Sequence, residues 1–227
     1  MIDNASRRRN YQPQPPYPIP SLPATLEAAG HAWRNYADPN ESYFDHITAL
    51  VSHRWNVPAA QFDADVAAGT LPDVAWLYAP NGLSEHPGNW TGGPVVGPGM
   101  HWTTARVNGV AHSPLWAHTA IFITWDDWGG WYDHVGPPSV ATWPGGGHAG
   151  YRGSQFRYGP RVPCLVVSPY ARQGLNHTFS SHASIVKFCL RLFALPRWNV
   201  PALAPGDRSG DLWESFDFQA PPRLSPP

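Results

Sequence analysis

The pattern of hydrophobic and polar positions divides the chain into short helices and strands with long connections between them. Apolar residues at helical spacing predict helices at residues 22–29, 43–53, 59–68, 100–110 and 181–193. Apolar, β-branched and aromatic runs predict strands at residues 31–36, 74–78, 119–125 and 162–168. This alternation of strands and helices favours an α/β fold with a mainly parallel sheet.

Polar, glycine-rich and proline-rich segments connect these elements. The longest are residues 81–99 and 136–160, and a structureless loop of this length inside a domain usually has a function or is disordered. We expect three parts: an extended arm at residues 1–20, one domain at residues 21–218 and a proline-rich tail at residues 219–227.

The most informative stretch runs from Thr119 to Pro138. Its strand-like first half ends in two adjacent carboxylates, Asp126 and Asp127, and two glycines, an aspartate and a histidine follow. Neighbouring carboxylates repel each other, so at the mouth of a core they need a compensating charge, which a divalent metal ion supplies. A surface turn also uses Asp and Gly, but the interleaved tryptophans argue against a plain solvated turn.

Histidines follow two other predicted strands. His86 lies in the loop after residues 74–78, and His177 and His182 come after residues 162–168. In a parallel sheet these loops would gather with the acidic pair at one carboxyl edge, where Asp and His together can bind a divalent metal. Each histidine taken alone fits a structural role equally well.

The composition narrows the class of partner. The formal net charge is −1, which gives no electrostatic reason to expect binding to nucleic acid or to an anionic membrane. No apolar stretch is long enough to span a bilayer, and the basic cluster near Met1 lacks the apolar segment of a secretory signal. Cys164 and Cys189 lie in apolar runs, so we expect buried, unreactive thiols.

The segment Trp125–Pro138, which reads WDDWGGWYDHVGPP, closely resembles a motif of the bacterial phosphoesterase family. That family includes phospholipases C of the phosphatidylcholine-cleaving type and a class of acid phosphatases, and it is related to the alkaline phosphatase superfamily. The resemblance covers residues 19–218. Further landmarks occur in family order at residues 71–72, 84–87, 113–116, 161–171, 181–188 and 213–218.

The resemblance implies a three-layer α/β/α sandwich of the alkaline-phosphatase-like type and metal-assisted hydrolysis of phosphate esters, including phospholipid headgroups. Asp126 and Asp127 match the paired acids that bind a divalent metal ion, whose identity stays open. His86, His134 and His182 match catalytic histidines that line the pocket. In such enzymes a metal-activated Ser or Thr hydroxyl forms a phospho-enzyme intermediate. The family is usually secreted or periplasmic.

The sequence departs from the family pattern at its beginning. The family starts with a strand and a Glu-Asn-x-Ser-Phe-Asp-His motif that completes the metal site, followed by a nucleophile-bearing segment. Residues 40–46, NESYFDH, are only superficially similar because Glu and Asn are reversed and no apolar strand precedes them. We therefore expect the middle and C-terminal part of a phosphoesterase, without the N-terminal strands of the full fold.

Two alternative functions remain open at this point. A truncated phosphoesterase remnant would lack the nucleophile and part of the metal site, and would be inactive or would dock onto a separately encoded N-terminal part. A weaker alternative is an aromatic-rich binding module. Tryptophans near the expected pocket would then bind a choline headgroup by cation–π contact, although they would serve simple packing equally well. They are Trp90, Trp102, Trp128 and Trp131.

Overall fold

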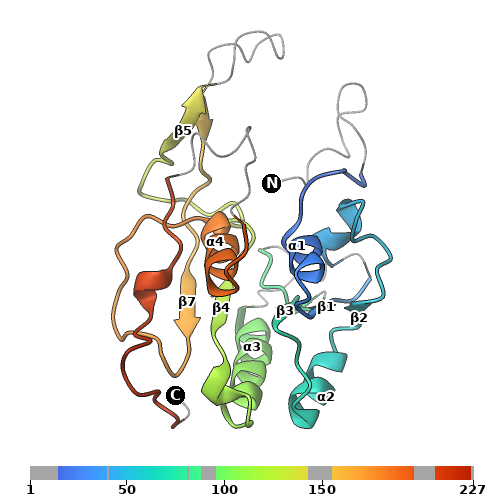
Figure 1. Cartoon of the computed structure of the whole chain (residues 1–227). Helices are drawn as coiled ribbons and strands as arrows, with labels where there is room; N and C mark the ends of the chain where they lie inside the picture. Colours follow the sequence, from blue (N-terminus) through green and yellow to red (C-terminus); the bar gives the residue numbers. More distant parts are fainter. Residues whose placement is uncertain are drawn as a thin grey trace. The chain divides into compact units, whose positions relative to one another are not determined.

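A computed structural model describes residues 15–39, 41–80, 82–87, 96–142, 155–196 and 208–225. The chain divides into two compact units, Met1–Leu115 and Trp116–Pro227, and each is described by itself. Both contain helices and strands, so the expected mixed α/β composition is confirmed (Figure 1). Within the described residues, no helix is both long and apolar enough to cross a bilayer.

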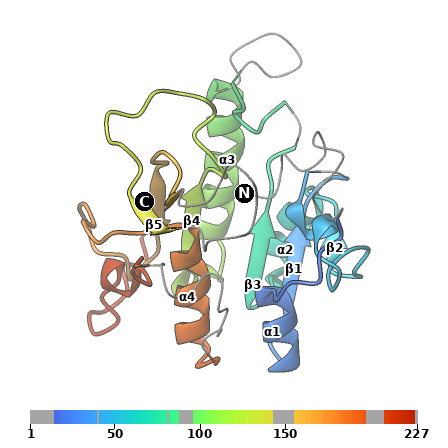
Figure 2. The same ribbon diagram turned by 90° about the horizontal axis from the view of Figure 1, so that it is seen from above.

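The first unit contains a parallel sheet of the order β2-β1-β3 (Figure 2). Its strands are β1 (Trp33–Tyr36), β2 (Asn56–Val57) and β3 (Val74–Leu77). β1 occupies the centre and pairs with β3 from Trp33↔Val74 to Tyr36↔Leu77. The expectation of a parallel sheet is therefore confirmed for the strands predicted at 31–36 and 74–78.

Three helices accompany this sheet in the first unit, and local signals in the sequence determine where they begin and end. They are α1 (Leu22–Ala28), α2 (Gln61–Ala68) and α3 (Val96–Ala111). The Ser21 side chain caps α1 by accepting a hydrogen bond from the amide of Ala24. Gly69 ends α2 in the left-handed conformation, with a φ of 67°, that glycine adopts without strain.

The predicted helix at residues 43–53 is wrong beyond its first turn. Ser42 caps a single 3₁₀ turn, η2 (Tyr43–His46), and the backbone of Ile47 is already extended. The reason is a competing partner: Tyr17 donates its amide hydrogen to the His46 carbonyl and accepts a hydrogen bond from Thr48. These bonds to the end of the N-terminal arm replace the helical ones.

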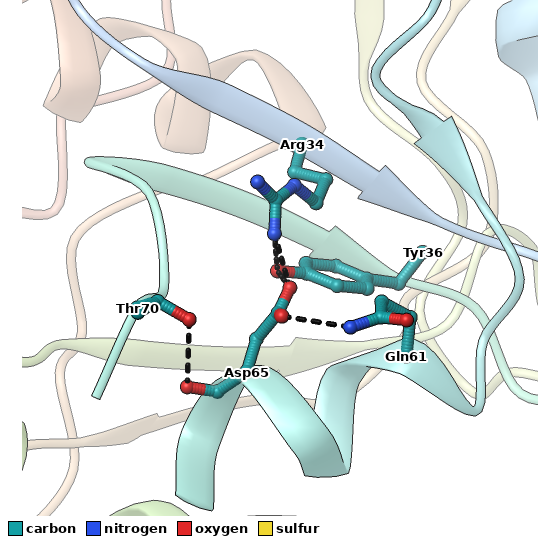
Figure 3. A network of polar contacts seen from close by, with 5 residues as sticks. All are labelled: Arg34, Tyr36, Gln61, Asp65 and Thr70. Atoms are coloured by element: carbon teal, nitrogen blue, oxygen red, sulfur yellow. Dashed lines mark hydrogen bonds and ion pairs between the residues drawn. The ribbon is translucent and has the colours of Figure 1, made fainter. Parts of the chain in front are cut away.

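A polar network ties α2 to the central strand of the first unit (Figure 3). Asp65 of α2 accepts hydrogen bonds from the Arg34 guanidinium, from the Tyr36 hydroxyl at 2.7 Å and from the Gln61 amide at 2.9 Å. Burial alone raises the pKa of Asp65, but these three donors outweigh it and lower the pKa below its ordinary value. Burial and the Asp65 carboxylate together raise the pKa of Tyr36.

The second unit contains an antiparallel pair of strands, β4 (Ile121–Thr124) and β7 (Cys164–Val167). The registers Ile121↔Val167 and Thr124↔Cys164 show that the carboxyl end of β4 lies beside the amino end of β7. The expected parallel arrangement is therefore wrong for this pair. The loops that follow the two strands leave from opposite ends, because antiparallel strands run in opposite directions.

The two strands are also less buried than the sequence predicts. Leu165 is 48% exposed and Cys164 is exposed, since β7 pairs with β4 alone among the strands of the described residues. The expectation of a buried thiol is thus wrong for Cys164. It is confirmed for Cys189, where burial raises the pKa of the thiol to about 11.

Aromatic side chains form much of the core of the second unit around α4 (His182–Leu192), which Figure 1 shows beside β4 and β7. Phe188 of α4 contacts Phe122 of β4 at 5.0 Å and Phe216 at 4.9 Å between ring centroids. Phe216 directly follows the short helix η4 (Trp213–Ser215), within the last of the segments that carry the family resemblance. Leu192, the last residue of α4, is 46% exposed.

The remaining elements of the second unit are η3 (Trp116–His118) and a hairpin formed by β5 (Ser139–Thr142) and β6 (Gln155–Arg157). Sequence patterning missed the hairpin, because residues 136–160 are rich in glycine and proline and show no strand-length apolar run. The predicted loop residues His148 and 145–147 lie outside the described residues.

Candidate active site

The acidic loop, residues 125–135, leaves the carboxyl end of β4 and carries both predicted metal ligands. Asp126 and Asp127 are exposed. One oxygen of Asp126 accepts the amide hydrogen of Asp127 at 3.0 Å, and one oxygen of Asp127 accepts that of Gly129 at 2.7 Å. Gly129 and Gly130 have φ values of 64° and 81°, so the loop turns through conformations that favour glycine. The two carboxylates are therefore presented to solvent on a tight turn.

His182, the first residue of α4, lies at the start of the acidic loop. Its Nε2 is 2.8 Å from the carbonyl oxygen of Trp125, the residue just before the acidic pair. A carbonyl can only accept a hydrogen bond, so Nε2 carries the hydrogen of this contact. The structure thus brings His182 to the backbone of the acidic loop, even though β4 and β7 are antiparallel.

His134 lies near the other end of the same loop. Its side chain is exposed, and its ring packs edge-on against Tyr132 with 5.5 Å between centroids. The imidazole is therefore accessible to solvent.

His86 belongs to the first unit, in the segment 82–87 that follows β3. Its ring nitrogen Nδ1 contacts the carbonyl oxygen of Pro87 at 2.9 Å, and the side chain is exposed. The segment packs closely on α3 at Gly99, where a Cβ would fall 2.7 Å from the Leu83 carbonyl oxygen and would also overlap Glu85. A glycine at that position therefore allows the segment that carries His86 to approach the helix.

A third aspartate of the acidic loop, Asp133, is not among the predicted site residues. It accepts hydrogen bonds from the backbone amide of Arg161 at 2.8 Å, from the Arg161 guanidinium and from the amide of Val135 at 3.0 Å. These donors, with the Arg161 guanidinium foremost, hold the pKa of Asp133 well below its usual range. Both residues fall within segments that carry the family resemblance, but the sequence holds no signal for their pairing across 28 positions.

Two aromatic side chains of the acidic loop are far more exposed to solvent than the candidate headgroup ligand Trp102. Trp131 is 71% exposed and Tyr132 is 85% exposed. Trp102 of the first unit instead lies under its neighbour Arg106, whose guanidinium carbon is 4.5 Å from the ring centroid. Trp90 lies outside the described residues.

The donor set for a metal ion is partial in this part of the chain. Asp126 and Asp127 offer the carboxylate oxygens that Mg²⁺ and Ca²⁺ prefer. Within the described residues, however, no three His, Cys, Asp or Glu side chains lie close enough together to hold one metal ion. Two adjacent carboxylates fit a metal as part of a larger set of ligands.

Comparison with known proteins places these features in a family. The chain matches the phosphoesterase family over residues 2–196. It is 29% identical to the non-hemolytic phospholipase C of Pseudomonas aeruginosa over 90% of the chain and 34% of the relative. It is 32% identical to phospholipase C A of Mycobacterium tuberculosis over 91% of the chain and 45% of the relative.

Phospholipase C B of Mycobacterium tuberculosis is 31% identical over 96% of the chain and 47% of the relative. The chain therefore spans between a third and a half of the length of these relatives. The matched region includes β4, the acidic loop, β7 and α4, so the elements that hold the acidic pair all fall within it. This chain belongs to the phosphoesterase family.

Proposed function

We propose that the chain carries part of the active site of a metal-assisted phosphoester hydrolase, with Asp126 and Asp127 as ligands of a divalent metal ion. The observation that carries the proposal is the acidic pair, exposed at the end of β4 in a chain of the phosphoesterase family. A divalent ion bound there would supply Lewis-acid stabilisation of charge on a phosphoryl oxygen.

The three histidines have distinct proposed roles. His182 holds the Trp125 carbonyl through Nε2 and so orients the backbone that leads into the acidic pair. His134, exposed on the same loop, is placed to move a proton to or from a bound phosphate ester. His86 lies in the other unit, and a catalytic role for it is based on the family resemblance alone.

The proposed substrate is a phosphate ester, and phospholipid headgroups are the first class to test. Several relatives are named phospholipase C, and they share 29–32% identity with this chain over most of its length. We also propose that the fold is of the alkaline-phosphatase-like type, a three-layer α/β/α sandwich.

A second candidate function is a non-catalytic phosphoesterase domain that needs further ligands and a nucleophile from elsewhere. One observation favours it: the described residues bring together no group of three metal-ligating side chains. Two carboxylates alone would bind a divalent ion weakly, because such ions take six or more oxygen ligands.

Hydrolysis of p-nitrophenyl phosphate and p-nitrophenyl phosphorylcholine by the purified chain separates these two functions. The assay would contain EDTA or one of Mg²⁺, Mn²⁺, Ca²⁺ and Zn²⁺. Catalysis predicts metal-dependent turnover that falls about 100-fold or more in Asp126→Asn, as for loss of a group that stabilises transition-state charge. Asp63→Asn, which removes an exposed carboxylate of α2, is the matched control. Turnover no higher than that of Asp126→Asn with every metal would overturn catalysis by this chain.

A further inference from the structure

Both ends of the acidic loop are attached to one short segment of chain, residues 161–164. At the start of the loop, Thr124 pairs with Cys164 in the β4–β7 ladder, and its hydroxyl donates to the Pro163 carbonyl at 2.9 Å. At the end of the loop, Asp133 binds Arg161. The residues between, including Asp126 and Asp127, therefore form a loop whose two ends are both held by this segment.

Arg161 binds Asp133 through both its backbone and its side chain. Its amide donates to Oδ2 at 2.8 Å, Nη2 donates to Oδ1 at 2.8 Å, and Nε lies 3.2 and 3.1 Å from the two oxygens. The amide of Val135 donates to Oδ1 at 3.0 Å. A carboxylate offers about four lone-pair positions, and these donors occupy them. Asp133 is therefore engaged as an acceptor and is not available as a third metal ligand.

The exposure of the two partners also indicates a geometric role. The Arg161 side chain is 66% exposed, whereas that of Asp133 is 12% exposed. An exposed ion pair contributes little to global stability, because water and salt screen it. A planar guanidinium that binds a carboxylate with two nitrogens does, however, fix the relative orientation of the segments that carry the two groups.

Fixing the loop matters because of what it carries. Two adjacent carboxylates repel each other, so a free loop would spread them apart and would sample many conformations. A cation would then have to order the loop as it binds, and the free-energy cost of this ordering would lower its affinity. A loop already closed at both ends avoids this loss.

We propose that Asp133 and Arg161 are positioning residues that hold the acidic loop in the conformation in which Asp126 and Asp127 receive a divalent cation. This inference rests on the proposed metal site. It assigns the third aspartate of the Trp125–Pro138 segment to orientation and leaves cation binding to the first two. His182 anchors the beginning of the same loop at the Trp125 carbonyl.

Terbium luminescence tests the proposal without reference to enzyme activity. Tb³⁺ is a hard cation that binds carboxylate oxygens, and tryptophans of the acidic loop, Trp125, Trp128 and Trp131, can sensitise its emission. Titration of the full chain yields an apparent Kd. We expect Asp126→Asn to weaken binding beyond about 30-fold, and Arg161→Gln and Asp133→Asn to weaken it about 5- to 10-fold, the range of a lost pre-organising contact.

Two further variants separate positioning from general structural damage. Arg191→Gln breaks another surface ion pair of the same unit, with Asp211 at 2.9 Å, and should leave Kd unchanged. In Arg161→Gln the Tm should match that of Arg191→Gln while Kd changes. The double variant Asp133→Asn/Arg161→Gln should bind Tb³⁺ with the same Kd as the single variant of lower affinity, because both substitutions remove one contact.

The outcomes distinguish the two levels of the proposal. Wild-type Kd in Arg161→Gln and Asp133→Asn, combined with lost binding in Asp126→Asn, would overturn the positioning role and leave the metal site standing. Equal Tb³⁺ emission from the wild type and Asp126→Asn would overturn the metal site and the positioning role together.

Discussion

One arginine–aspartate pair of each unit, Arg34–Asp65 in the first and Arg161–Asp133 in the second, can be compared, and their surroundings differ. Arg34 and Asp65 are enclosed in the first unit, with 22% and 9% of their side chains exposed, and Tyr36 and Gln61 complete the network. Arg161 and Asp133 join two loop segments of the second unit, and the guanidinium is largely exposed. The same chemistry thus fixes a helix on a sheet in one unit and the shape of a loop in the other.

This difference separates stability from site geometry. Removing one partner of a buried pair leaves a charge that water cannot reach, so the whole unit is destabilised. Removing one partner of a surface pair exposes the other to solvent, and global stability barely changes. Substitutions at Asp65 should therefore change the free energy of unfolding, whereas substitutions at Arg161 should change the conformation of the acidic loop.

The largest expected effect is at Asp65. Asp65→Ala leaves the Arg34 guanidinium and the Tyr36 hydroxyl without their shared acceptor, and we expect a loss of about 3 kcal/mol in the free energy of unfolding. Urea denaturation followed by circular dichroism measures it. Asp63→Ala, in the same helix but exposed and paired with Arg106, should lose no more than about 1 kcal/mol. Equal midpoints for the two variants would contradict the role assigned to the network.

The pH dependence of stability should show the same network, with a smaller effect. The pKa of Asp65 is lower in the folded chain than its ordinary value of 3.8, so its contribution is fully present above that value. The contribution is lost as the pH falls through the depressed folded pKa. We therefore expect the difference in unfolding free energy between wild type and Asp65→Asn to shrink below about pH 4. A difference that stays constant from pH 7 to pH 3 would contradict this.

The smallest effect on global stability is expected at Arg161. The urea midpoint of unfolding should equal that of the wild type in Arg161→Gln, whereas it should be lower in Arg34→Gln. Hydrogen–deuterium exchange should nevertheless speed up in Arg161→Gln for amides of the acidic loop, because the loop loses its closing contact. Unchanged exchange in residues 126–135 would show that the loop keeps its conformation without the guanidinium.

Local signals in the sequence predicted most of the elements but few of their partners. Gly69 and Ser181 lie at the ends of helices that the sequence predicts at 59–68 and 181–193, because capping depends on neighbouring residues. The helix expected at 43–53 failed because Tyr17, distant in the chain, competes for the same backbone groups. The predicted parallel direction of β7 relative to β4 is wrong for a related reason, since an apolar run does not specify which strand it pairs with or in which direction.

The same limit applies to the candidate site. Asp126 and Asp127 are candidates from sequence because two adjacent carboxylates follow an apolar strand-length run, which the structure forms as β4. His182 was identifiable by resemblance, but its bond to the Trp125 carbonyl needs the return of the chain to the start of the acidic loop. The Asp133–Arg161 contact joins residues whose types are unremarkable alone, and only the fold places them together.

Isothermal titration calorimetry measures directly whether the acidic loop binds a divalent metal ion. Mg²⁺, Mn²⁺, Ca²⁺ and Zn²⁺ would each be titrated into the wild-type chain and into the double variant Asp126→Asn/Asp127→Asn. We expect saturable binding of at least one of these ions at one site per chain, and loss of that binding in the double variant. Indistinguishable titrations of the two proteins with all four ions would contradict it.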